Sequence, residues 1–423
     1  MTDKAGMSIR HNLLGGSLWL AASFVGAQTP APSLSLDQAL QAATQHPQVQ
    51  ASERQAQAAR ADVQSANRAP APTLSAGLSS IDLQRTAGQS SGLSATRMDK
   101  SVGLDWTWER GNKRTLRVQG AEQLAQAALA DVNEVRLQQQ SGALSAYYEV
   151  LATQQRVRTL SDIAASATRL AQVARLRLQA GDLSVQDQTR MAIESERAEA
   201  DLQAAQQDLA QAQTQLADWT ALPRPGSGWQ IAGPWPAAQA LPVDARLQEW
   251  VERRADVQAA RARVSAAQAG LASAQALRVP DPSVGTSIDQ LPGTGAGRQL
   301  SLRLSIPLNT SGRFDSDIAR AQAQLDQAQA QLEQSRLRAH TELQSLLQIW
   351  RSQSERLRRY EQDILPPAQK VATQAELAYS KGGLSLTDLL DARRTLRSLE
   401  LEALQVRKDH ALAQSQWQLR THP

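Results

Sequence analysis

Two similar stretches of the sequence contain four aspartates, and three of them could attract cations or help to begin a helix. "KGGLSLTDLLDA" contains Asp388 and Asp391, and the earlier stretch "AGDLSVQDQTRMA" contains Asp187 at the position that corresponds to Asp388. Each stretch predicts a helix that starts near its serine, and the dipole of a helix favours negative charge at that end. Asp391 follows Asp388 by three residues, so both carboxylates can face the same side. The pattern leaves two roles open, helix capping and an acidic site.

Other residue types that carry chemistry are absent or scattered. The sequence has no cysteine, which excludes disulfides, thiolate metal ligands, a cysteine nucleophile and a lipidated N-terminal cysteine. Its five histidines are dispersed, and none lies in the context of a catalytic triad or a metal-ligand motif. "GTGAGR" (Gly293–Arg298) lacks the GK[ST] ending of a phosphate loop and lies between two expected strands, so we interpret it as a hairpin loop. We therefore expect no enzyme, no cofactor and no metal site.

The composition favours long helices over a thick globular core. Of the 423 residues, 41% are hydrophobic but only 4% are aromatic, and alanine, glutamine, leucine and arginine are abundant. Lys and Arg total 45 against 41 Asp and Glu, and this net charge of +4 is not gathered in a patch. We therefore expect no nucleic-acid partner.

Residues 1–27 are predicted to be a secretory signal peptide. Lys4 and Arg10 form a short basic region, the apolar run Leu13–Val25 follows, and the small residues that end at Ala27 suit a signal peptidase. An uncleaved membrane anchor is the alternative, although the run is short for a spanning helix. No other stretch contains about 20 apolar residues, so we expect an exported chain without a membrane helix.

The rest of the sequence is predicted to contain two structural repeats. His46–Gly77 aligns with Arg254–Gly285, including a proline and a glycine beyond the helical part, and the two aspartate-bearing stretches also align. This alignment places the first repeat at 28–221 and the second at 244–423. The Pro/Gly-rich segment 222–243 between them is interpreted as a linker or equatorial segment.

Each repeat is predicted to fold as helix, strand, loop, strand, long helix, turn and helix. The predicted helices are Leu36–Arg68, Leu116–Gln179 and Ser184–Leu216 in the first repeat, and Asp244–Leu277, Asp315–Tyr379 and Ser385–Gln418 in the second. The turns 180–187 and 381–388 separate the last two helices of each repeat. Ser35 suits a capping box at the first helix, and Pro366 and Pro367 should kink the second long helix.

The spacing of apolar residues in these helices is typical of coiled coils. Alternating steps of three and four residues join Leu202, Ala205, Leu209, Ala212 and Leu216, and likewise Ile318, Ala321, Leu325, Ala328 and Leu332. An ordinary helical bundle is the alternative, but helices of this length are far beyond the globular norm.

Four segments of about ten residues are predicted to be strands of a membrane β-barrel. They are Thr73–Gln84, Lys100–Arg110, Pro282–Leu291 and Gln299–Leu308. Two of them alternate apolar and polar residues, a pattern that a soluble amphipathic sheet also has. Trp106 and Trp108 lie on the apolar face near a strand end, where membrane-interface aromatics occur. Four strands cannot close a barrel with a lumen, so several chains would share one, and three chains would supply twelve strands.

With these features the sequence resembles the TolC family of trimeric outer-membrane efflux ducts. The resemblance covers nearly the whole exported chain and rests on "LSLDQALQAATQHPQVQAS", "APAP" before the first strand, "RGNKR" after the second, the duplication, and the helix-tip sequence "AYSKGGLSLTDLLDA". It implies a mainly α-helical homotrimer with a transmembrane β-barrel portion. Four strands per chain would form a shared 12-stranded barrel in the lipid of a Gram-negative outer membrane, and long antiparallel coiled-coil helices would form an α-barrel in the periplasm.

The resemblance also implies a function and partners. The chain would be the channel of a tripartite efflux or type I secretion system, passively exporting substrates from an inner-membrane pump (RND, ABC or MFS type) and a periplasmic adaptor (membrane fusion) protein. "RGNKR" resembles the heavy-metal efflux branch more closely. The alternative is a periplasmic coiled-coil structural or adaptor protein without a membrane barrel, although adaptors lack this duplication.

The tip sequences match the family residue by residue. The match assigns Asp187, Tyr379, Asp388 and Asp391 to the periplasmic aperture, where rings of three aspartates would favour cations and the tyrosine would tether neighbouring helices. The turn residues expected to dock the adaptor are Gly181, Leu183, Ser184, Gly382, Leu384 and Ser385. Leu384 departs from the family, because the best-known member has an arginine there in its constricting network. We therefore expect other contacts to hold the closed aperture.

Overall fold

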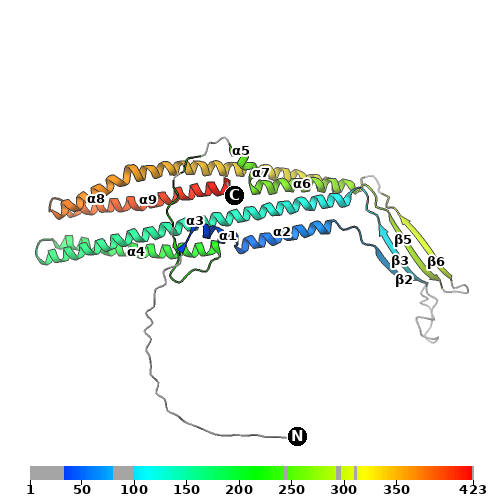
Figure 1. The fold of residues 1–423 in the computed structure, drawn as a ribbon, viewed down its shortest axis with the longest axis horizontal. Coiled ribbons are helices and arrows are strands. Elements are labelled where there is room, and N and C mark those ends of the chain that lie inside the picture. Colours follow the sequence, from blue (N-terminus) through cyan, green and yellow to red (C-terminus); the bar gives the residue numbers. More distant parts are fainter. Residues whose placement is uncertain are drawn as a thin grey trace, which may run out of the picture.

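The computed structural model describes residues 33–79, 99–231, 233–237, 239–241, 246–291, 297–308 and 312–421. The predicted signal peptide, residues 80–84 of the first predicted strand, most of "GTGAGR" and part of the predicted linker lie outside these residues. The described chain is mainly helical, and its helices run along one axis that ends in a small β-sheet (Figure 1).

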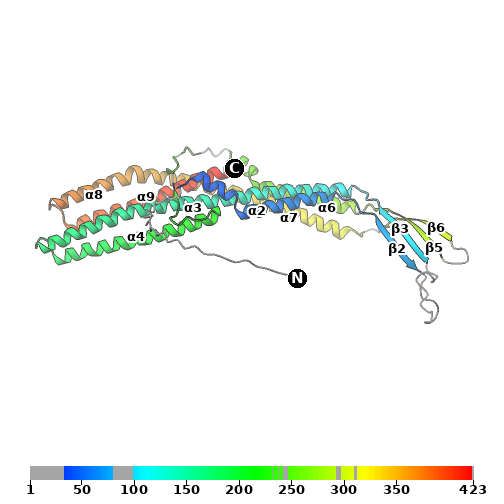
Figure 2. The ribbon, with the colours of Figure 1, turned by 60° about the horizontal axis from the view of Figure 1, so that its bottom comes forward.

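Two antiparallel helix pairs form the part of the molecule furthest from the sheet. The first pair is α3 (Lys113–Gln179) with α4 (Val185–Thr220), and the second is α8 (Leu365–Ser380) with α9 (Leu386–Thr421). Both pairs reverse direction at the same end of the molecule (Figures 1 and 2). The 67 residues of α3 confirm the predicted long helix, which extends about 100 Å at 1.5 Å per residue. Within the described ranges, no helix is both long enough and apolar enough to span a membrane.

The prediction of a single helix at 36–68 is wrong. This segment is divided into α1 (Leu36–Thr44) and α2 (Pro47–Ala66). Ser35 caps α1 through the capping box that its sequence predicts. Pro47 cannot supply the N–H that would continue α1, but it fits the first turn of α2, where that N–H needs no partner.

The helix predicted at 244–277 is also divided. Its described part consists of α5 (Leu247–Arg253) and α6 (Ala255–Ala276), separated by Arg254 in an extended conformation with ψ of 143°. The guanidinium of Arg254 is buried and pairs with one carboxylate of α6 and one of the following long helix, at 2.9 and 2.8 Å. These contacts stabilise the extended conformation at Arg254. The helical spacing of apolar residues does not predict them.

The second long helix is interrupted, as its two prolines predict. It consists of α7 (Asp315–Arg358), a π-helical segment at Arg359–Ile364, and α8. Pro366 and Pro367 occupy the first turn of α8, where they lack the N–H groups that would bond to carbonyls of the preceding turn. The first long helix contains no proline and is continuous.

The predicted coiled-coil spacing is confirmed by burial. Ala205, Ala212 and Leu216 of α4 are buried, and so are Ala321 and Leu325 of α7, while residues between them on the outer faces are exposed. Small alanines at these positions let the helices approach closely, which is why a chain with so few aromatic residues can still bury a continuous seam.

The sheet contains four antiparallel strands. In spatial order they are β2 (Thr73–Ser79), β3 (Asp99–Thr107), β5 (Ser283–Leu291) and β6 (Gly297–Ser305). The register pairs apolar residues across the sheet, for example Trp106 with Val284 and Val284 with Leu304. These side chains are exposed, and Leu302 on the same face is 78% exposed. On the other face the Ser301 hydroxyl donates to Asp289 Oδ2 at 2.8 Å, so the sheet has one apolar and one polar face.

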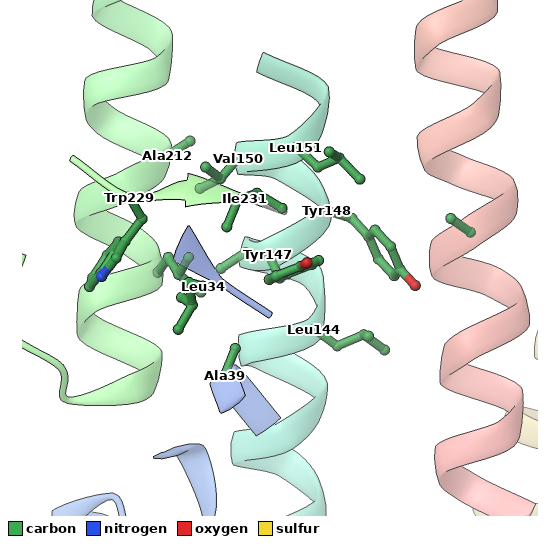
Figure 3. Close-up of a cluster of buried hydrophobic side chains, with 13 residues drawn as sticks. Leu34, Ala39, Leu144, Tyr147, Tyr148, Val150, Leu151, Ala212, Trp229 and Ile231 are labelled. Carbon is green, nitrogen blue, oxygen red and sulfur yellow. The ribbon is translucent and has the colours of Figure 1, made fainter. Parts of the chain in front are cut away.

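The largest part of the core lies midway along the helices and includes residues from the predicted linker. Short strands β1 (Ser33–Leu34) and β4 (Gln230–Ile231) pair in parallel over α3. Figure 3 shows Leu34 and Ile231 near Tyr147 of α3 and Trp229 beside α4, while Tyr148 points the other way, towards α9. The Gln154 amide donates to the Trp229 carbonyl at 2.7 Å and accepts from the Ile231 N–H. The described part of segment 222–243 is therefore packed into the helices.

Candidate functional site at the helix turns

The two helix turns are built in the same way. Gly181 and Gly382 have φ of 80° and 75°, the left-handed region that ends a helix at little cost only for glycine. In each turn the N–H of the following residue donates to a carbonyl five positions back, from Asp182 to Arg177 and from Gly383 to Ala378, both at 2.9 Å. The chain can thus reverse within a few residues and bring the starts of α4 and α9 to the same end.

Serine and aspartate cap the helix that leaves each turn. The hydroxyl of Ser184 accepts from the Asp187 N–H at 3.0 Å and donates to the Asp187 carboxylate at 2.8 Å. Ser385 and Asp388 repeat this arrangement at 3.2 and 2.6 Å. The structure therefore places Asp187 and Asp388 in a capping role, which the sequence left open beside an acidic site.

Asp391 differs from the other two aspartates. It lies one turn further along α9, is exposed, and makes no hydrogen bond or ion pair with any described residue. Its charge acts on Arg394, which lies three residues on, and raises the pKa of that guanidinium together with Glu194. Of the predicted aperture residues, Asp391 is the one whose carboxylate is free to meet solvent or cations.

A small hydrophobic cluster joins the two turns. Ala174 of α3, Met191 of α4, and Leu386 and Leu390 of α9 are buried together. Leu183 from the first turn and Tyr379 from the end of α8 are partly buried against this cluster. Leu384 is also half-buried, but it is not a member of the cluster. The structure therefore brings Leu183 and Tyr379 together and leaves the two glycines and the two serines exposed around them.

Ionic and polar contacts connect α4 to α9 near the turns, and sequence reasoning missed them. Arg394 Nη2 donates to Glu194 Oε2 at 2.6 Å, and Arg397 pairs with Asp201. The hydrogen bonds from Arg394 lower the pKa of Glu194, which is only 16% exposed in its side chain. Nearer the turn, Arg190 Nη1 donates to Thr387 Oγ1 at 3.4 Å.

A sequence signal for these contacts exists in α4. An acidic residue occurs every seven positions, at Asp187, Glu194, Asp201 and Asp208. A seven-residue spacing keeps the carboxylates on one face of a coiled-coil helix. In the structure the two central members face arginines of α9, and the last binds Arg156 of α3 at 3.2 Å.

The other predicted residues lie at the sheet end. Trp106, in β3, is 64% exposed and Trp108, just beyond that strand, is 70% exposed. Both lie at the end of β3 that leads into α3, which begins at Lys113. Their exposure on the apolar side of the strand is compatible with a membrane interface, which is where such side chains are favoured.

The "RGNKR" motif forms the corner between β3 and α3. Asn112 takes the left-handed conformation with φ of 56°, and Lys113 follows with only 7% of its surface exposed. Lys113 Nζ donates to the Val279 carbonyl at 2.7 Å and to Asp281 Oδ2 at 2.8 Å. The Arg110 N–H donates to the other oxygen of Asp281. The motif thus fastens the first half of the chain to the second where the sheet joins the helices.

No group of three or more His, Cys, Asp or Glu side chains is arranged to hold a metal ion within the part of the chain that the structure describes. Of the carboxylates near the turns, Asp187 and Asp388 belong to helix caps and Glu194 binds an arginine, whereas Asp182 and Asp391 form no ion pair or side-chain hydrogen bond with a described residue.

Comparisons with known proteins agree with this arrangement. The model of the family "Outer membrane efflux protein" matches residues 39–221 and 247–421. The chain is 28% identical over 306 residues to the cobalt-zinc-cadmium resistance protein CzcC of Cupriavidus metallidurans, covering 70% of this chain and 71% of the relative.

Solved structures of outer-membrane channels have the same fold. The channel OprN matches with a TM-score of 0.78 at 20% identity, over 91% of this chain and 89% of its own. CusC matches with a TM-score of 0.75 at 18% identity, over 91% of each chain. The chain therefore belongs to the outer membrane efflux protein family, whose members are channels of the Gram-negative outer membrane with their helical part in the periplasm.

Proposed function

We propose that three copies of this chain form a passive export duct whose shared barrel contains twelve strands. The observation that carries this proposal is the sheet at the end of the long helices. Its apolar face is exposed along all four strands, with Leu74, Leu104, Ile288 and Leu302 each about half exposed or more. Lipid is the solvent that favours such a face, because burying apolar surface away from water stabilises the protein.

The unpaired edges of the sheet indicate that several chains form one barrel. β2 and β6 are edge strands in a single chain, and their outer N–H and C=O groups need partners. In hydrocarbon an unpaired backbone group costs several kcal/mol, so a membrane sheet must close. Pairing β2 of one chain with β6 of its neighbour would close the sheet.

We further propose that the repeats predicted at 28–221 and 244–423 correspond to the two helix pairs and their strands. Segment 222–243 would then join them around the middle of the helices. The similar construction of the turns at 180–187 and 381–388, with Gly, Ser and Asp in the same order, supports this division.

The turns are proposed to form the periplasmic aperture and to dock an adaptor that links the duct to an inner-membrane pump. Ion pairs between α4 and α9 would hold this end closed in place of the arginine that Leu384 replaces. Asp391 would face the pore, and Asp388 would belong chiefly to the cap of α9.

Divalent heavy-metal ions are the proposed cargo. Support comes from the similarity to CzcC, whose name refers to cobalt, zinc and cadmium resistance. A duct needs no resident metal site, because its task is to offer a path and not to bind its cargo tightly.

The proposal is tested by fractionation and by metal accumulation in the native bacterium. The protein should appear in the outer-membrane fraction as a species that runs as a trimer until heated in detergent. Deleting its gene should raise cellular cobalt, zinc or cadmium, and expression of the intact chain should restore the original level. A monomer in the soluble periplasmic fraction would contradict the duct, whereas an outer-membrane trimer without any effect on metals would contradict only the cargo.

A further inference from the structure

A cavity of about 520 Å³ lies between the two helix pairs, above the turns. Residues of α3, α4, α8 and α9 line it, so one molecule in the cavity would touch both helix pairs of the chain. The volume is in the range of pockets that hold small organic ligands, which is about 300–1,000 Å³. Nothing in the duct function requires this space to be occupied.

About half of the wall of the cavity is apolar, and the rest is polar or charged. Side chains from all four helices contribute to the apolar part, among them Ile163, Leu170, Met191, Leu365, Leu390 and Leu404. Met191 and Leu390 belong to the hydrophobic cluster that joins the turns. A ligand that displaces water from such a wall must itself present an apolar body.

The wall contains four arginines and four carboxylates, but two of the arginines pair with carboxylates outside the wall. Its arginines all have carboxylate partners: Arg393 with Glu376, Arg394 with Glu194, Arg397 with Asp201, and Arg407 with Glu361. Glu400 of α9 and Asp162 of α3 also line the cavity, and neither forms an ion pair or hydrogen bond with a described residue. Two carboxylates of the wall are thus left without a cationic partner, which makes the potential negative in their immediate surroundings.

Glu400 is the better placed of these two carboxylates. It is half-buried, whereas Asp162 is exposed, so water screens the charge of Glu400 less effectively. Burial raises the pKa of Glu400 above its ordinary value, as expected of a carboxylate that lacks a cationic partner. A positive charge placed beside it would remove this penalty.

We propose that the cavity binds an organic cation with an apolar body, such as a quaternary ammonium or phosphonium compound, with its charge beside Glu400. A hydrated metal ion does not suit the same place. It needs oxygen ligands or bound water, and the leucine and isoleucine side chains of the cavity supply no such ligands and do not favour a hydrated ion beside them. The bound cation contacts α3 and α4 on one side and α8 and α9 on the other, so it stabilises their present arrangement and opposes their separation.

The experiment uses tetraphenylphosphonium as the probe and the intact protein purified in detergent. Isothermal titration should detect binding, and Glu400→Gln, which keeps the shape but removes the charge, should weaken it about five- to tenfold. Asp162→Asn should have a smaller effect, because that side chain is exposed. Triphenylphosphine oxide, which is neutral and of similar shape, should bind equally to the wild type and to Glu400→Gln.

Two control variants define the site. Glu196→Gln removes an exposed carboxylate of α4 that does not line the cavity, and it should leave binding unchanged. Asp391→Asn should also leave it unchanged, which separates the cavity from the acidic turn. Unaltered affinity in Glu400→Gln, or an equal loss in Asp391→Asn, would overturn the proposal. So would absence of binding to a protein that still runs as a heat-labile trimer.

Discussion

Arg394 of α9 binds Glu194 of α4 through a 2.6 Å contact between Nη2 and Oε2, and this ion pair joins the two helix pairs of one chain. Arg397 and Asp201 form a second contact of the same kind further from the turns. Hydrogen bonds from Arg394 lower the pKa of Glu194, so this carboxylate stays charged at neutral pH. The two helix pairs are thus held together near the turns by paired charges.

Removing these contacts should open the duct. In planar bilayers we expect Arg394→Gln combined with Arg397→Gln to raise the open probability at least twofold, because the remaining carboxylates then favour water over the opposite helix. Exchanging the charges, with Glu194→Arg and Arg394→Glu together, should restore part of the closed behaviour. Arg393→Gln is the matched control, since Arg393 binds Glu376 within one helix pair. An equal effect of this control would show that the contact between pairs is not the cause.

Asp391 should govern cation preference without supporting the fold. Asp391→Asn is expected to reduce the ratio of potassium to chloride permeability about twofold, because it removes an exposed negative charge near the aperture. The comparison is Asp187→Asn, which removes the charge of a carboxylate in the first turn and should chiefly affect the stability of α4, by about 0.3–1 kcal/mol. Reversal potentials in a salt gradient measure the first effect. Unchanged selectivity in Asp391→Asn would place this side chain away from the pore.

The stability of the second turn should depend on Gly382 but should be little affected by a change at Gly383. Gly382→Ala forces a Cβ into the left-handed region at φ of 75° and should cost about 1–2 kcal/mol locally. Gly383→Ala is the control, because a Cβ there would only meet the Ala378 carbonyl at an ordinary 3.7 Å. Hydrogen–deuterium exchange across residues 376–390 should become faster in the first variant only. Similar exchange in both variants would mean that the turn relaxes to another conformation.

His410 should make the protein less stable in mild acid. Its imidazole is 2% exposed, and burial lowers its pKa below the ordinary 6.5 despite the nearby charge of Glu361. Because the unfolded chain then binds protons more readily than the folded one, the contribution of His410 to stability is complete above about pH 6.5 and is lost as pH falls towards the lowered folded value.

The measurement compares the thermal midpoint of the wild type and of His410→Gln in detergent at pH 7.5 and pH 5.5. Other groups titrate in both proteins and change both thermal midpoints. The difference between the two proteins in how far the midpoint falls from pH 7.5 to pH 5.5 is therefore due to the histidine. The wild type should lose more of its thermal midpoint between the two pH values than the variant does. Equal falls in the two proteins would mean that His410 does not titrate differently on folding.

Much of the local structure could be predicted from short stretches of sequence. The glycine at each turn, the serine that follows it and the alternation of apolar residues in the strands act within a few residues, and the structure has each of them at the predicted place. The prolines at the start of α8 interrupt the second long helix as predicted. The break at Arg254 was not predictable in this way, because a carboxylate of the distant helix α7 holds it.

The sequence by itself determined most of the helices and strands and where the chain reverses, because propensity, periodicity and capping depend on neighbours along the chain, but it did not determine the break at Arg254. Only the tertiary structure decided what the aspartates do. Asp187 and Asp388 cap their helices, Asp391 is left free, and Glu194, which no motif singled out, holds the two helix pairs together. The caps are local contacts over three residues, but the contact of Glu194 with Arg394 depends on which faces of distant helices meet, and the packing of the whole bundle sets that rotation.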